Sequence, residues 1–294
     1  MQVNPKTGLK EEWHEFYRLP LVHQRGIGSL KFNGQQNAVH KVPLGGGLTL
    51  DFYAQLRRSD ELVVTLPGAA LADRNIYPLF ARVSTFRPTN HAFMAFADPT
   101  IMMDESREMR LSWFAGGPAF DPTHFIVRAI RKAMGKTGSK HVVFVGGSGG
   151  GLAALRLSAM MPGSLAYLHE GTTNIANSLP NSVARYFSVA WPGWDQELLL
   201  HGLPERFDMV RYYRSAQPQN FVYYAQSEDD HRFRGDHYGP FREAMGVTEE
   251  SGVTRDGRRK FVLYKGEVAG HGRVTADEFD YHFNNALNHW RTLR

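Results

Sequence analysis

Short apolar runs, bounded by polar or turn-forming residues, recur along the chain and predict β-strands. Residues 1–45 are weakly patterned by comparison, and we expect edge strands or an N-terminal extension there. The apolar runs that predict strands are residues 48–54, 61–66, 91–96, 142–145, 164–169, 221–225 and 261–264.

Helix signals stand between and after these runs. Asp121 is a good N-cap residue, and Pro122 follows it in the first helical turn. Apolar residues then line one face of residues 126–134, and we expect the helix to end at Gly135. A capping box at residues 275–278 opens a second clear helix at the C-terminal end of the chain.

Strands that alternate with helices predict an α/β fold, a doubly wound, mainly parallel sheet in one domain that spans residues 1–294. About fifty residues separate the strands at 164–169 and 221–225, which is more than a plain crossover needs. Two explanations stay open: a cap inserted at residues 172–215 over the carboxyl edge of the sheet, or surface helices that bury their aromatic side chains. The aromatic residues concerned are Trp191, Trp194, Phe207, Tyr212 and Tyr213.

Composition sets limits on the partners of the chain. Its 294 residues are 42% hydrophobic, enough for a large core, and its 34 basic and 29 acidic residues give a net charge of +5. The basic residues are spread out, and their densest cluster, residues 255–260, contains an Asp-Gly pair. That pair favours a solvated hairpin tip, so we expect no nucleic-acid partner.

The chain has no cysteine, which excludes disulfides, thiolate metal sites and a cysteine nucleophile. Residues 1–12 lack the apolar segment of a signal peptide, and no run reaches the roughly 20 apolar residues that span a bilayer. We therefore expect a cytoplasmic protein without a membrane span. The sequence carries no indication of the oligomeric state.

The chemistry of the chain is indicated first by a glycine-rich turn. Gly146, Ser148 and Gly150 form G-x-S-x-G between the strand at 142–145 and a helix-forming stretch at 152–157. In this arrangement, the nucleophile elbow, small residues let strand and helix approach while a strained serine exposes its hydroxyl. Ser148 is therefore the candidate nucleophile.

A serine hydroxyl needs a base to take its proton and an acid to orient that base. Asp230 follows the strand at 221–225, and His271 follows the last strand, which gives the chain order Ser, Asp, His. Asp229 is the alternative acid. For the oxyanion, Gly149 supplies one backbone N–H, and Ala69, or next Ala70, is the candidate for the second.

With these residues the chain resembles the α/β-hydrolase superfamily of serine esterases, lipases and acyltransferases. The resemblance covers roughly residues 48–290 and rests on residues 146–150, on Pro67-Gly68-Ala69, on Asp230 and on residues 270–272. One departure is Pro67, where many members have histidine, although a backbone N–H donor does not depend on that side chain. The resemblance implies a carboxylic ester hydrolase that forms an acyl-enzyme. Its substrate is a small-molecule or glycoconjugate ester, and the acyl group passes to water or to a sugar hydroxyl.

Other interpretations remain. Residues 149–154 also fit G-x-G-x-x-A, and Glu170 follows at the distance of a dinucleotide-binding site. Several predicted strands precede these residues, whereas a dinucleotide-binding unit usually opens its domain. This order argues against a dinucleotide site. A hydrolase-fold binding protein without activity would lack an intact triad, whereas all three residue types are present here. A P-loop is excluded, because its Gly-Lys-Ser/Thr ending is missing. The acidic and histidine-rich residues 228–237 are explained by loop polarity, so we expect no metal and no cofactor.

Overall fold

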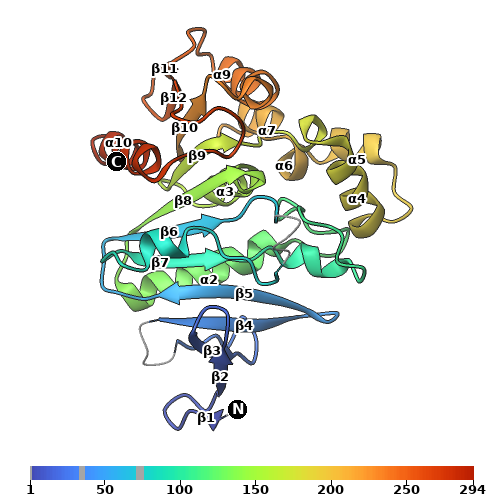
Figure 1. Cartoon of the computed structure of the whole chain (residues 1–294), viewed down its shortest axis with the longest axis vertical. Coiled ribbons are helices and arrows are strands. Elements are labelled where there is room, and N and C mark those ends of the chain that lie inside the picture. Colours follow the sequence, from blue (N-terminus) through green and yellow to red (C-terminus); the bar gives the residue numbers. More distant parts are fainter. Residues whose placement is uncertain (1, 33–36, 71–75) are drawn as a thin grey trace. The chain divides into compact units, whose positions relative to one another are not determined.

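The computed structural model of the chain describes residues 2–32, 37–70 and 76–294. Two compact units make up the chain, residues 1–142 and residues 143–294 (Figure 1). The single hydrolase domain expected from the sequence stays a prediction.

The first unit consists mainly of strands. Their spatial order is β1-β2-β3-β4-β5-β7-β6, with parallel pairing for β3 with β4 and for β6 with β7. The other neighbours in this order are antiparallel, and short loops join β1 to β2, β2 to β3 and β4 to β5. The strands are β1 (Gln2–Val3), β2 (Lys10–His14), β3 (Leu19–His23), β4 (Asn37–Gly45), β5 (Leu48–Gln55), β6 (Glu61–Leu66) and β7 (Ala92–Phe96).

The three strands predicted in this unit are confirmed as β5, β6 and β7. Every residue of β6 and β7 is buried, which explains why both read as continuous apolar runs. The N-terminal edge strands expected at residues 1–45 are also present. β2 is mostly exposed, so its sequence shows no apolar face.

The described residues of the first unit also form three helical segments: α1 (Val83–Phe86), η2 (Pro99–Met103) and α2 (Pro122–Thr137). Asp121 caps α2 as predicted, by accepting the N–H of Thr123 at 3.0 Å. The predicted end at Gly135 is wrong, because the helix continues to Thr137. Glycine inside a helix costs only about 1 kcal/mol, and the left-handed residue that ends α2 is Gly138 (φ 76°).

The second unit is an α/β arrangement with strand order β8-β9-β10-β12-β11 (Figure 1). Pairing is parallel from β8 to β12, and only β11 is antiparallel to its neighbour. The strands are β8 (His141–Ser148), β9 (Leu165–Gly171), β10 (Phe221–Ser227), β11 (Gly252–Val253) and β12 (Arg259–Tyr264). The helical segments are α3 (Gly149–Ala159), η3 (Ile175–Asn177), α4 (Pro180–Ala190), α5 (Gln196–Gly202), α6 (Pro204–Phe207), α7 (Met209–Ala216), α8 (His231–Phe233), η4 (Arg234–Tyr238), α9 (Gly239–Ala244) and α10 (Ala276–Arg291).

These elements confirm the predicted α/β class with parallel strands and flanking helices. The capping box at the start of α10 is present, with Thr275 and Glu278 bonded to each other's backbone. From α10, Phe279 and Phe283 pack against Tyr167 of β9, with ring centroids 5.6 and 5.8 Å apart. Since β8, β9, β10 and β12 are parallel, their carboxyl ends lie at one edge of the sheet.

The segment between β9 and β10, the predicted cap insertion at residues 172–215, is helical and contains η3 and α4 to α7. Of the five aromatic residues named in the sequence analysis, Trp191, Phe207 and Tyr213 are buried, whereas Trp194 is 57% exposed. The burial fits helices that bury their aromatic side chains, and a covering role stays a prediction.

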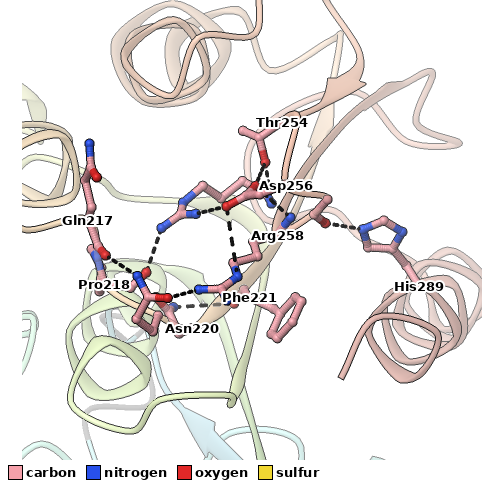
Figure 2. Close-up of polar contacts among 11 residues, drawn as sticks. Gln217, Pro218, Asn220, Phe221, Thr254, Asp256, Arg258 and His289 are labelled. Carbon is pink, nitrogen blue, oxygen red and sulfur yellow. Dashed lines mark hydrogen bonds and ion pairs between the residues drawn. The ribbon is translucent and has the colours of Figure 1, made fainter.

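The basic cluster forms the tip of the β11–β12 hairpin, as its Asp-Gly pair predicted (Figure 2). Asp256 accepts the Thr254 hydroxyl at 2.6 Å and the Arg258 backbone N–H at 3.1 Å. The Arg259 guanidinium donates to Asp256 and to the Pro218 carbonyl, at 3.4 and 2.7 Å. Charged side chains of this cluster are thus engaged in hydrogen bonds within the second unit.

Among the helices that the structure describes, none combines the length and the apolar character that a membrane crossing requires.

Candidate active site

Ser148 lies at a sharp turn between β8 and α3. Its backbone has a positive φ (φ 49°, ψ −131°), a conformation that costs a residue with a Cβ some strain. A Cβ at Gly146 would lie 2.1 Å from the Gly150 carbonyl oxygen, and one at Gly147 would lie 2.2 Å from Nε2 of His169. Both distances are far below van der Waals contact. At position 146 strand and helix can therefore meet only through glycine, whereas a Cβ at position 147 would displace the His169 side chain of β9.

The Ser148 hydroxyl points to His271 rather than to the helix. Ser148 is the N-cap of α3, yet its side chain makes no capping hydrogen bond. Instead, Oγ lies 2.9 Å from Nε2 of His271, and Nδ1 of His271 lies 2.7 Å from Oδ2 of Asp230. With the serine donating to Nε2, the ring proton is on Nδ1 and is donated to Asp230. The structure therefore brings together the three residues that the sequence selected.

Asp230, rather than its neighbour Asp229, makes the bond to His271. It is the N-cap of the short helix α8, where Oδ1 accepts the N–H of Phe233 at 3.2 Å. Burial alone would raise the pKa of Asp230, but the hydrogen bond from His271 and the electrostatic interaction with that residue outweigh it, so its pKa is lowered. Asp230 is thus held as a carboxylate, the form that can orient an imidazole.

Two aromatic rings pack behind the histidine. Phe233 is stacked on His271 with centroids 3.7 Å apart and planes 16° apart, and His237 lies 4.6 Å from Phe233. His237 is fully buried, and burial lowers its pKa to about 3, so it is neutral near pH 7. These rings restrict the orientation of the His271 imidazole.

Glu170, which the sequence does not mark as a residue of this site, also lies beside His271. Its Oε2 accepts the N–H of Gly272 at 2.6 Å and lies 3.7 Å from Nδ1 of His271. Burial is the largest influence on this carboxylate and raises its pKa. One signal was available: Glu170 ends the strand next to β8 and therefore stands at the same sheet edge as Ser148.

The candidate oxyanion donors differ in position. Gly149 begins α3 directly after Ser148, where backbone N–H groups have no partner within the helix. Ala69 belongs to the first unit, is exposed and comes soon after β6. The N–H of Ala70 is already donated to the Arg110 carbonyl at 2.9 Å, which leaves Ala69 as the better candidate of the two. The role of both donors stays a prediction.

One cluster in the described part of the chain has the atoms that a metal ion would need. Carboxylate and imidazole atoms of Glu170, Asp230 and His271 lie within 4.8 Å of one another. These atoms already accept the Gly272 N–H or form the bond between His271 and Asp230. A cation at Nδ1 would break the bond that orients His271, so the hydrogen-bonded arrangement does not fit a resident metal.

No family model matches this chain, and no curated protein matches it in sequence.

Solved structures with the same fold are numerous. A capsule O-acetyltransferase of Neisseria meningitidis serogroup A superimposes with a TM-score of 0.52 at 14% identity, over 86% of this chain and 91% of the acetyltransferase. Carboxyl esterase 2 from the mycorrhizal fungus Tuber melanosporum superimposes with a TM-score of 0.53 at 12% identity, over 90% of this chain and 89% of the esterase. Esterase B from Lactobacillus rhamnosis, inhibited by a tributyrin phosphonate, superimposes with a TM-score of 0.53 at 15% identity, over 91% of this chain and 89% of esterase B. The chain therefore has the α/β-hydrolase fold that its sequence pattern predicted.

Proposed function

We propose that this protein is a serine hydrolase that cleaves a carboxylic ester through an acyl-enzyme. The observation that carries the proposal is the continuous hydrogen-bonded series from Ser148 through His271 to Asp230, at 2.9 and 2.7 Å. A strained serine at a strand-to-helix turn and a carboxylate kept ionised are the two further features that this chemistry requires.

In the proposed reaction, Ser148 Oγ attacks the ester carbonyl carbon while Nε2 of His271 takes the hydroxyl proton. Asp230 stabilises the imidazolium that forms. The oxyanion accepts a hydrogen bond from the N–H of Gly149, and a second donor at Ala69 stays a prediction from the sequence. The tetrahedral intermediate then collapses, the C–O bond breaks, and the alcohol leaves with the proton from Nε2. Water, activated by the same histidine, releases the acid and restores Ser148.

Acyl transfer to a sugar hydroxyl is the second candidate, since an acyl-enzyme passes its acyl group to whichever hydroxyl reaches it. The capsule O-acetyltransferase among the structural neighbours favours this alternative. The substrate class in either case is a small-molecule or glycoconjugate ester. Release of the acid in the presence and absence of sugar acceptors distinguishes the two.

The dinucleotide interpretation is weaker on this geometry. It needs the carboxylate of Glu170 for a ribose hydroxyl, yet Oε2 of Glu170 is occupied by the N–H of Gly272. A non-catalytic binding protein would leave the hydrogen-bonded series of three groups without a purpose.

The test is hydrolysis of a short-chain aryl ester by the Ser148→Ala variant. Loss of a triad member lowers kcat by several orders of magnitude, and we expect that loss here. Ser215→Ala is the matched control, because Ser215 is exposed on α7. Near-full activity of Ser148→Ala, or an equal loss in both variants, would refute the proposal.

A further inference from the structure

A second buried carboxylate lies at the same ring nitrogen of His271 as Asp230. Glu170 is 2% exposed, and its Oε2 is 3.7 Å from Nδ1, whereas Asp230 is 2.7 Å away. Only one carboxylate is needed to orient a histidine in a serine hydrolase. The proposed reaction therefore leaves Glu170 without a role.

The backbone adopts a strained conformation to place this side chain. Glu170 has a positive φ of 48°, which is unfavourable for a residue with a Cβ. The ladder between β8 and β9 shifts register here, since Gly147 pairs with His169 and Ser148 pairs with Gly171. Glu170 is thus the extra residue of a bulge, a device that re-aims a side chain. Strain and burial of a charged group at one position are the marks of a functional residue.

The loop that carries His271 needs external anchors. Gly270 and Gly272 flank the histidine with φ values of 101° and 70°, so local sterics do little to fix the backbone. Glu170 holds Gly272 at 2.6 Å. At the ends of the same loop, Glu278 accepts the N–H groups of Glu267 and Thr275, at 2.7 and 2.8 Å. Of these anchors, Glu170 is the one whose carboxyl group also lies beside the imidazole.

The charged groups around this ring come from several elements. Asp230 and Glu170 lie on one side of His271, and the buried His237 lies behind Phe233. Arg232 interacts electrostatically with Asp230 and His237, and Glu278 interacts electrostatically with Glu170. Tyr224 and Tyr264 are also within electrostatic range of Glu170, but both hydroxyls are neutral because burial raises their pKa values.

We propose that Glu170 is a positioning residue for His271. It holds the loop through the N–H of Gly272 and stabilises the imidazolium with a second negative charge beside Asp230. This inference rests on the proposed serine hydrolase function. It predicts two separable effects, one of charge and one of loop attachment.

Three variants separate these effects. Glu170→Gln keeps an oxygen acceptor for Gly272 and removes the charge, whereas Glu170→Asp keeps the charge on a shorter side chain. Glu278→Gln is the matched control, because it weakens an anchor of the same loop away from the imidazole. The readout is the second-order rate of Ser148 labelling by a fluorophosphonate between pH 4.5 and 9, with folding checked by circular dichroism.

Removal of a negative charge beside the imidazolium makes its proton easier to lose. We expect the acidic limb of the Glu170→Gln profile to move to lower pH by about one unit, and its plateau to fall about tenfold. Glu170→Asp and Glu278→Gln should keep the limb of the unaltered protein, whatever their effect on the plateau.

A Glu170→Gln profile that superimposes on that of the unaltered protein would overturn this inference alone. An equal shift of the acidic limb in Glu278→Gln or in Glu170→Asp would overturn it as well. If the unaltered protein is not labelled at Ser148, the proposed function fails and the inference falls with it.

Discussion

Phe233 contacts both His271 and Asp230. Its ring is stacked on His271 with centroids 3.7 Å apart, and its backbone N–H is donated to Asp230 at 3.2 Å. A single residue of α8 therefore fixes the plane of the imidazole and one oxygen of the carboxylate. Because the contact to Asp230 uses the backbone, a side-chain substitution tests the stacking alone.

The substitution Phe233→Leu keeps a buried apolar side chain and removes the flat surface under the imidazole. We expect kcat/KM for an aryl ester to fall about tenfold, since a misoriented base loses transition-state stabilisation. The free energy of unfolding should change by less than about 1.5 kcal/mol, as in other apolar exchanges of similar size. Unchanged kcat/KM would show that stacking does not orient the ring.

The glycine at the start of the elbow is required for packing. A Cβ at Gly146 would lie 2.1 Å from the Gly150 carbonyl oxygen, so Gly146→Ala must push strand and helix apart. We expect a loss of about 1–3 kcal/mol in the free energy of unfolding and loss of ester hydrolysis.

Gly135 supplies the matched control, since no atom lies within 4 Å of a Cβ built there inside α2. Gly135→Ala should raise the free energy of unfolding by about 1 kcal/mol and leave hydrolysis unchanged. Both are measured by urea denaturation and an ester assay. Equal stability changes in the two variants would contradict the steric account.

The two adjacent aspartates offer a test of the acid. Asp230→Asn replaces the carboxylate that accepts the Nδ1 proton of His271. We expect kcat to fall about 10⁴-fold, because the amide no longer holds the imidazole in the tautomer with its proton on Nδ1. Asp229→Asn is the control and should keep at least about half of the activity. A larger loss of activity in Asp229→Asn than in Asp230→Asn would assign the role of the acid to Asp229.

His237 links stability to pH. Burial lowers its pKa to about 3, from 6.5 in the unfolded chain. Between these values the unfolded state binds one more proton, so the free energy of unfolding falls as the pH falls, by about 1.4 kcal/mol per pH unit. His237→Gln removes this contribution, and the slope between pH 6 and 4 should become shallower by that amount. An identical slope in urea titrations of both proteins would contradict the burial of a neutral imidazole.

The elbow and the order of the site residues were readable from the sequence because each rests on local sterics or on strand ends. A serine between glycines, after one strand and before one helix, has few alternatives. In a parallel sheet, residues that follow different strands meet at one edge, which brought Asp230 and His271 to Ser148.

Other features depend on backbone torsions that composition does not reveal. Glu170 reaches His271 only because of a bulge and a positive φ, and the sequence marks neither. The end of α2 was misplaced because two glycines, Gly135 and Gly138, stand close together and only the second is left-handed. The exposed strand β2 has no apolar periodicity to detect.

The most direct measurement of the central claim is the site of covalent modification. The protein is incubated with a fluorophosphonate, digested, and its peptides are mapped by mass spectrometry, with His271→Ala treated in parallel. A serine activated by an adjacent base is expected to react, so the adduct should be found on Ser148 and be lost in His271→Ala. An adduct on a different serine, or equal labelling of Ser148 in both proteins, would contradict the account.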